Sequence, residues 1–370
     1  MAPRIIRRKI MGSATSVNGS TFSVDRGWRL AAIGLLAVRF VQGWIYWGGG
    51  TRRFIYGPQK LDAWGGGHWM AYKFQTAMPG ALLGTEHLVS FLLQHFVLLY
   101  VGVIVFSLVE LFAGFMLITG LLTRIAALTT IGLSFVLMLL FGWQGATCID
   151  EWTMAASNFA MGVTLLLVGG GAYSLDNWLL AKKPGLAQKG WFRWMGGSLP
   201  LPLSDQAYKK FALLLFWIAV AFIVGTYSYY RGSVVTPFHG GPVSPSKHHW
   251  SLSNGRLQGD GTVTFHAYVD AGTPEAPSNV LHVTLVDTRN GSVVEEWDSA
   301  KLAALPKTAL KNDYDYQKIH IGKYGITGPV GSKATIILPP AASDLKLPAG
   351  TYTLKLNSVN GSVWTIPLQR

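Results

Sequence analysis

The stretch "SLVELFAGFMLITGLLTR", residues 107–124, decides the fold class, because it is apolar enough to lie in lipid and yet carries Glu110 close to its middle. An ionisable residue at mid-bilayer is costly, so it usually faces the interior of a helix bundle and pairs with another group. The stretch therefore predicts a membrane helix that packs against others and buries a carboxyl for a structural or functional reason.

The composition extends this prediction to the whole chain. Its 370 residues are 50% hydrophobic and 13% charged, with 14 Trp, 14 Tyr and 18 Phe, which is too apolar for an ordinary soluble domain. Runs of about 20 apolar residues, each able to cross a hydrocarbon core of about 30 Å, occur at 29–48, 97–121, 124–142, 152–172 and 210–230. We expect these to form a four-helix membrane bundle and a fifth transmembrane helix. Residues 86–96 are expected to lie at the interface.

The chain changes character after the last apolar run. Segments such as "TVTFHAYVD" and "TYTLKLNSV" alternate apolar and polar residues between turn-forming residues, which predicts an antiparallel β-sandwich. The expected domains are an uncleaved N-terminal arm (1–28), the four-helix domain (29–183), a linker (184–208), the fifth helix (209–231) and the β-sandwich (232–370).

The positions of Lys and Arg predict the orientation. Basic residues precede the first span and lie between spans two and three and between spans four and five, which places those segments in the cytoplasm. The expected location is the plasma (inner) membrane, with a cytoplasmic N-terminus and an extracytoplasmic sandwich. Of the net charge of +13, residues 1–231 carry most, with 19 Lys+Arg against 8 Asp+Glu. This excess follows from membrane topology and the outer loop, and it does not indicate a nucleic-acid partner.

Glu110 has a candidate partner in the first span. Counted from the cytoplasmic ends of their helices, Arg39 and Glu110 lie at matching depth, about 15 Å into the membrane. We therefore expect an Arg39–Glu110 pair, either as a structural clamp or as part of a proton path or buried site.

The first outer loop opens with "WIYWGGGTRRF", residues 44–54. Its aromatic residues suit an interfacial belt, which does not explain three glycines followed by Arg52 and Arg53. Glycines expose backbone N–H groups and guanidiniums offer forked donors, so the loop predicts an oxyanion site. Lys73, His87 and His95 lie in the same outward region and could reinforce it, although they could equally be solvated surface residues.

The second outer loop, "GWQGATCIDEW", holds the only cysteine, Cys148, beside Asp150 and Glu151. This cysteine is either buried and inert or reactive. The two acids could act chemically, or they could simply favour the start of the next helix.

The β region offers a weaker possibility of a metal site. His266, His282 and His320 each occupy the polar phase of an expected strand, where they are either metal ligands on one sheet face or solvated. The chain has no convincing dinucleotide, Walker A or cysteine-cluster motif, so we predict neither a metal nor a flavin. In "GGGAYSLD", we expect Ser174 to cap an interfacial helix.

The blocks "WIYWGGGTRRF", "VELFAGFMLITGLLTRIAAL", "TCIDEW" and "GGGAYSLD" together resemble DoxD, a membrane subunit of thiosulfate:quinone oxidoreductase within the wider DoxX-like four-helix family. The part from about residue 205 resembles the partner subunit DoxA, so the chain looks like a fusion of the two. The resemblance implies oxidation of two thiosulfate ions to tetrathionate, with electrons passed to a membrane quinone.

The residues can be sorted by the roles that this reaction implies. The expected catalytic residues are Cys148, Glu151, Asp150 and Glu110; the expected substrate-binding residues are Arg52, Arg53, Arg39, His87, His95 and Lys73; the expected quinone-binding residues are Trp44, Tyr46, Trp47, Trp143 and Trp152. One hypothesis gives Cys148 a transient bond to a thiosulfate sulfur. Its rival is direct electron transfer between the bound reactants.

The expected partners are thiosulfate, a membrane quinone and the lipid bilayer, with a homo-oligomer as an open possibility. Two other classes of function also stay open. Paired charges inside a membrane are used by transporters, so the chain could carry sulfur oxyanions. It could also be a non-catalytic membrane anchor whose β domain binds a partner.

Overall fold

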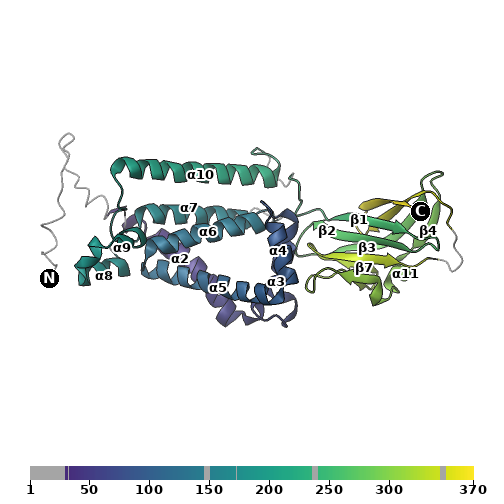
Figure 1. The fold of residues 1–370 in the computed structure, drawn as a ribbon, viewed down its shortest axis with the longest axis horizontal. Coiled ribbons are helices and arrows are strands. Elements are labelled where there is room, and N and C mark those ends of the chain that lie inside the picture. The colour runs from purple at the N-terminus through teal and green to yellow at the C-terminus, as the bar shows by residue number, and fades with distance from the viewer. Residues whose placement is uncertain (1–29, 32, 146–150, 172, 236–240, 342–346) are drawn as a thin grey trace.

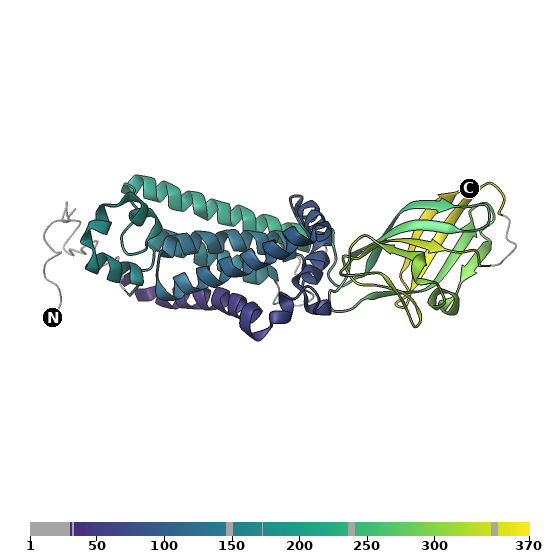
Figure 2. The same cartoon turned by 60° about the horizontal axis from the view of Figure 1, so that its bottom comes forward.

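The computed structural model describes residues 30–370 except positions 32, 146–150, 172, 236–240 and 342–346. The described chain is elongated, with a helical part and a β part end to end (Figures 1 and 2). We call the end of the helical part that meets the β part the sandwich-side end, and the opposite end the far end.

Four helices form the bundle. They are α2 (Leu36–Thr51), α5 (Phe96–Thr119), α6 (Thr123–Phe141) and α7 (Glu151–Val168), and α10 (Asp205–Arg231) runs along their outside (Figure 1). Among the described residues, α5, α6 and α10 are long and apolar enough to cross a membrane. The other two expected spans are present as the bundle helices α2 and α7.

Glycines allow α2 and α5 to pack closely. A Cβ added at Gly114 would lie 2.2 Å from the backbone nitrogen of Trp47, and one added at Gly50 would lie 2.7 Å from the Cβ of Leu111. A Cβ at Gly43 would be equally crowded, 2.9 Å from Ile118. Small residues at helix contacts are typical of membrane bundles. There the hydrophobic effect does not drive helices together, and van der Waals packing of closely spaced backbones does so instead.

The first helix is longer than expected from the sequence. The apolar run ends at residue 48, but α2 continues to Thr51 and then into a π-helical turn, Arg52–Tyr56. The "GGGTRR" segment is therefore mostly helical and not an open loop, and the π-turn sets the directions of its two arginines.

Short helices cover both ends of the bundle. The sandwich-side end carries α3 (Met70–Ala77) and α4 (Thr85–Gln94), with 3-10 turns at Pro58–Lys60, Gly66–His68 and Met78–Gly80. The far end carries α8 (Leu175–Lys182), the 3-10 turn Pro184–Gln188 and α9 (Gly190–Met195) (Figure 1). Ser174 caps α8 as predicted, because its hydroxyl accepts a hydrogen bond of 3.1 Å from the backbone N–H of Asn177.

The β part is a sandwich of two antiparallel sheets, as predicted. Its strands are β1 (His249–Leu257), β2 (Val263–Ala271), β3 (Ser278–Asp287), β4 (Val293–Trp297), β5 (Leu310–Asn312), β6 (His320–Gly322), β7 (Gly325–Gly328), β8 (Lys333–Leu338), β9 (Thr351–Ser358) and β10 (Val363–Gln369). One sheet has the order β1-β2-β8-β5 and the other β10-β9-β3-β7-β6, with β4 paired to β3. The short helix α11 (Ser299–Ala303) and the turn Lys307–Ala309 connect β4 to β5.

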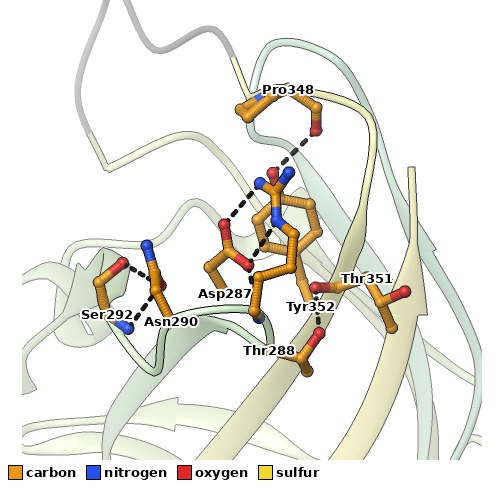
Figure 3. Close-up of polar contacts among 8 residues, drawn as sticks. Asp287, Thr288, Asn290, Ser292, Pro348, Thr351 and Tyr352 are labelled. Carbon is orange, nitrogen blue, oxygen red and sulfur yellow. Dashed lines mark hydrogen bonds and ion pairs between the residues drawn. The ribbon is translucent and has the colours of Figure 1, made fainter.

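The alternation in the sequence places the core between the sheets. In β2, every second residue from Val263 to Ala271 is buried, and β9 buries Tyr352, Leu354 and Leu356 in the same way. At the β3–β4 turn, Asp287 pairs with Arg289 at 2.7 Å, and a second contact joins the Thr288 hydroxyl to the Thr351 carbonyl at 2.6 Å (Figure 3). The Arg289 contact lowers the pKa of the Asp287 carboxyl.

Candidate functional site

The sandwich is fastened to the bundle through buried side chains of α3. The amide nitrogen of Gln75 donates to the main-chain oxygens of Gln317 at 2.7 Å and Gly331 at 3.1 Å. Its amide oxygen accepts a 2.8 Å bond from the backbone N–H of Gln317. Gln75 is fully buried, so this glutamine holds two loops of the sandwich against the bundle.

A second set of contacts comes from α4, a helix within the segment expected at 86–96, which lies across the sandwich-side end. Glu86 pairs with Lys333 at 3.2 Å, and the Ser90 and Tyr314 hydroxyls are 2.7 Å apart. The Tyr268 hydroxyl donates to Glu86 at 3.4 Å. Burial, followed by the Glu86 charge, raises the pKa of Tyr268. Both helices thus bind the sandwich by polar contacts.

A cavity of about 510 Å³ lies at this junction. The bundle segments contribute Gly67, Tyr72, Lys73, Thr76, Gln144, Gly145 and Glu151, and the sandwich contributes Pro274, Glu275 and Gln317. Four separate stretches of the chain therefore line one pocket. Two of its lining residues, Gly145 and Glu151, flank residues 146–150, so the expected Cys148 and Asp150 lie outside the described residues.

One ion pair crosses the pocket wall. The Lys73 amino group is 2.9 Å from a carboxylate oxygen of Glu151, and the two side chains are 49% and 27% exposed. Lys73 also lies 5.1 Å from the centre of the Phe141 ring, within range of a cation–π contact. The structure thus brings together two predicted site residues from different loops, at a point that solvent reaches.

Further cations lie close to this pair. Burial lowers the pKa of Lys60, and the charges of Arg52, Lys73 and Arg53 lower it further. Four positive side chains therefore share one region at the sandwich-side end. Arg52 is exposed, and no described residue accepts a hydrogen bond from its guanidinium, so it is available to an anion in solution.

The expected Arg39–Glu110 pair is wrong. Glu110 forms an ion pair with Arg53, and their side chains are only 13% and 11% exposed. Arg53 also lies 5.5 Å from the Phe106 ring centre. Because the helix continues past residue 48, Arg53 points into the bundle beside the carboxyl. Arg53 is therefore not a free anion ligand of the outer loop.

Arg39 lies toward the far end instead. Its guanidinium donates to the carbonyl oxygens of Gly170 and, at 2.6 Å, Tyr173. The distance from α3 and α4 along the bundle rules out direct contact with a ligand in the junction cavity. His87 and His95 are exposed on α4 and its end, and neither lines the cavity.

The five aromatic residues expected to bind quinone do not form one cluster. The Tyr46 hydroxyl contacts the Ser134 hydroxyl at 3.3 Å inside the bundle, and the Trp143 indole donates to the Ala77 carbonyl at 2.9 Å. Trp152 donates to the Thr226 hydroxyl of α10 at 3.0 Å. The remaining two lie on α2, where Trp44 is 57% exposed and Trp47 packs against Phe115.

The three sandwich histidines do not meet. His266 lies in the first sheet, 3.0 Å from Asp313, whereas His282 lies in the second sheet, 2.7 Å from Glu296. His320 contacts the carbonyl oxygen of Lys318. Across the part of the chain that the structure describes, no group of three potential ligands could hold a metal ion.

Sequence reasoning missed a clasp at the far end. The buried Asp176 accepts hydrogen bonds from the backbone N–H groups of Leu122, Thr123 and Gly197, at 2.7, 3.1 and 2.7 Å. Arg124, which is 1% exposed, donates to four carbonyl oxygens, including that of Gly196 at 2.6 Å. In the sequence, Arg124 is simply one of the basic residues between spans two and three that indicate orientation.

Comparisons with known proteins agree with this arrangement. Residues 35–205 match the family described as "TQO small subunit DoxD", and residues 230–366 match the family described as "TQO small subunit DoxA". A solved structure titled "Structure of Iho670 Flagellar-like Filament" matches 44% of this chain and 97% of its own, at 10% identity and a TM-score of 0.20. That score is too low to carry an argument.

Proposed function

Because this chain joins a DoxD-family segment to a DoxA-family segment, both small subunits of thiosulfate:quinone oxidoreductase, we propose that it oxidises thiosulfate at the junction of the two segments. The electrons pass to a membrane quinone. In balance, two thiosulfate ions, one quinone and two protons yield one tetrathionate and one quinol. The chain is a membrane protein, so a lipid-soluble acceptor can reach it directly.

Electrostatics sets the main requirement for this reaction. Two dianions about 5 Å apart repel each other by about 3 kcal/mol at the dielectric of water, and by about four times as much at an effective dielectric near 20. A site that couples them must therefore be cationic. Arg52, Lys60 and Lys73 supply positive charge at the sandwich-side end, as the lowered pKa of Lys60 indicates.

The junction cavity is the observation that carries the proposal. It is large enough for small anions, at about 510 Å³, and it is lined by both family segments. Lys73 offers an ammonium group on its wall, and Glu151 lies within hydrogen-bonding distance of that ammonium. Glu151 orients Lys73, and an incoming anion competes for the same ammonium.

The quinone must approach from lipid. Among the expected aromatic contacts, Trp44 and Trp47 are our candidates, because Trp44 is largely exposed on the bundle surface and stacks on Phe40 at 5.7 Å. Both tryptophans lie on α2, within about three turns of Arg53. We also propose that the sandwich-side end is extracytoplasmic, because the basic segments between the other spans gather at the far end.

The central experiment measures reduction of a soluble quinone analogue by the purified full-length protein with thiosulfate. We expect two thiosulfate ions consumed per quinone, with tetrathionate as product. Lys73→Gln should raise the KM for thiosulfate about tenfold, since it removes a charge-assisted contact. Lys311→Gln, which removes an exposed lysine on β5, is the matched control and should leave the KM unchanged.

Two results would contradict the proposal. One is an inactive wild-type protein that binds neither reactant. The other is uptake of labelled thiosulfate into sealed vesicles without quinone, which would make the protein a transporter.

Cys148 stays a sequence-based prediction. In the covalent route, its thiolate forms a sulfur–sulfur bond to one thiosulfate while the quinone takes two electrons and two protons. A second thiosulfate then attacks that bond, releases tetrathionate and regenerates the thiolate. Cys148→Ser should abolish turnover in this route, and full activity of the variant would leave direct electron transfer as the mechanism.

A further inference from the structure

One face of α2 is polar along its whole length. Arg39, Gln42, Tyr46 and Gly49 follow each other in α2 at intervals of three and four, so they share one side of the helix. The π-helical turn that follows adds Arg53 at the end of this stripe. All of these except Gly49, which is partly exposed, are buried. A helix face buried in a bundle is normally apolar, so this stripe requires an explanation.

The stripe contacts polar groups on the facing helices. The Gln42 amide donates to the Thr130 hydroxyl at 3.2 Å and to the main-chain oxygen of Asn158 at 2.7 Å. One turn along, the Tyr46 hydroxyl reaches both the Ser134 hydroxyl and the Thr130 carbonyl. The Gln42 amide and Tyr46 hydroxyl of α2, the Thr130 and Ser134 hydroxyls of α6 and the Asn158 carbonyl of α7 thus form one connected group inside the bundle.

The group continues to the sandwich-side end. A Cβ on Gly49 would lie 3.3 Å from a carboxylate oxygen of Glu110, so the missing side chain leaves room beside that carboxyl. Glu110 pairs with Arg53 and lies near enough to interact electrostatically with the Tyr46 hydroxyl. From Arg53 to Arg39 the stripe extends about 21 Å along the helix.

Unpartnered polar atoms concentrate on this stripe. Within the described ranges, buried side-chain atoms without a hydrogen-bond partner belong to Arg39, Gln42, Arg53, Trp69, Asn158, Ser198 and Glu295. Four of these seven residues lie on α2, on the π-turn that follows it or on the facing helix α7. Rotating the Gln42 amide would not help, because its partner at Asn158 is a carbonyl oxygen that cannot donate.

These unpartnered atoms are of both kinds. The Nε atoms of Arg39 and Arg53 are donors, whereas the side-chain oxygens of Gln42 and Asn158 are acceptors. Buried polar groups in proteins are satisfied by protein or by ordered water. Water is the small molecule that can both donate and accept, so it fits all four atoms.

We propose that the polar face of α2, from Arg53 to Arg39, is a hydrated pathway that carries protons through the bundle to the place of quinone reduction. The proposal rests on the proposed function, because each quinone that takes two electrons from thiosulfate also takes two protons. Chains of hydroxyls and water transfer protons, and polar residues inside membrane helices commonly mark such relays. The Tyr46 and Ser134 hydroxyls are the links, and Glu110 is the group that accepts a proton.

The first test compares two tyrosines of similar burial. Tyr46→Phe removes a hydroxyl from the pathway, whereas Tyr230→Phe removes one that bonds to the Met138 carbonyl outside it. With thiosulfate and a soluble quinone analogue, Tyr46→Phe should lower kcat about tenfold. It should also raise the solvent deuterium isotope effect without changing the KM for thiosulfate. Identical behaviour of the two variants would overturn the pathway.

The second test needs no activity. Hydroxyl radicals generated by X-rays from bound water label side chains next to that water, and mass spectrometry locates the label. Tyr46 is 7% exposed and Tyr230 is 4% exposed, so exposure alone predicts similar labelling. We expect much stronger labelling at Tyr46.

Equal labelling of the two tyrosines would show that the stripe is dry and would reject the proposal. A wild-type protein without thiosulfate-dependent quinone reduction would instead count against the proposed function, and the labelling would still decide whether the stripe holds water.

Discussion

Lys60 shows how single charges tune the junction. Its pKa is lowered by burial and by three neighbouring cations, so it loses its proton at a lower pH than an ordinary lysine. The ammonium form attracts an anion and the neutral amine does not. Affinity for thiosulfate should therefore fall as pH rises through the lowered pKa of this group.

Lys60→Arg should remove part of this pH dependence, because a guanidinium keeps its charge throughout. The measurement is the dissociation constant for thiosulfate from neutral pH upward, as far as the ordinary lysine pKa of 10.5. Lys311→Arg, at an exposed site on β5, is the control and should behave as the wild type. Parallel pH profiles for Lys60→Arg and the wild type would exclude Lys60 from the anion site.

The buried carboxyl of Glu295 should make the stability of the folded protein depend on pH. It is 4% exposed, and burial raises its pKa to about 7, although one oxygen accepts a 2.9 Å bond from the backbone N–H of Ala341. The unfolded chain ionises this carboxyl near the ordinary value, while the folded chain keeps its proton until about pH 7. The folded state therefore loses stability as pH rises between those two values, by up to about 3 kcal/mol.

Glu295→Gln should flatten this dependence, since the amide does not titrate. Thermal unfolding of the purified protein at pH 5 and pH 8 provides the comparison, and the difference between the two midpoints is the readout. A wild-type midpoint that does not fall toward pH 8 would contradict the raised pKa.

At the scale of elements, the contact between α2 and α5 depends on glycine. Gly114→Ala would place a methyl group against the backbone of Trp47, which should cost about 1–3 kcal/mol through overpacking. Gly102→Ala on the same helix meets nothing within 4 Å and is the matched control. The measurement is the thermal unfolding midpoint of each variant in detergent, which should fall for Gly114→Ala only. Equal midpoints for the two variants would contradict close packing at Gly114.

The same helix pair shows what the sequence could predict. Apolar runs and strand alternation are strong local signals, so the bundle, the outer helix and the sandwich followed from them. The partner of Glu110 did not, because it depends on where α2 ends. Hydropathy falls at residue 48, whereas the backbone stays helical to Thr51 and then forms a π-turn to Tyr56.

The polar stripe on α2 was present in the sequence as a period of three and four through Arg39, Gln42, Tyr46 and Arg53. It could have been found by asking which face of the first span lacks apolar residues. The cavity at the junction could not have been found in this way. It requires knowing that loops near residues 274 and 317 meet residues 67–76, and such long-range contacts leave no local pattern.

At the scale of the whole molecule, the joint between the two segments should be sensitive to Gln75. Gln75→Leu removes three hydrogen bonds to the sandwich and leaves backbone polar groups of Gln317 and Gly331 without these partners. We expect the joint to weaken by about 1–3 kcal/mol. Faster tryptic cleavage at the exposed Lys247, between α10 and β1, would report the loosening.

The matched variant is Gln94→Leu, which changes an exposed glutamine at the end of α4. It should be cleaved at the wild-type rate. If Gln75→Leu is cleaved no faster, the sandwich is held mainly by α4, and the contact between Glu86 and Lys333 becomes the next one to remove.

The helix α10 is the covalent connection between the bundle and the sandwich. It begins at the far end and runs about 40 Å back along the bundle to the end that faces the sandwich, where β1 follows it in the chain (Figure 1). Only 6% of its most apolar stretch is buried within the protein, so it serves as a tether more than as a packing element. Because α10 links the bundle and the sandwich in one chain, the two parts meet at an effective concentration in the millimolar range. If the contacts between the bundle and the sandwich break, the tether keeps the two parts together, so the cavity between them can form again.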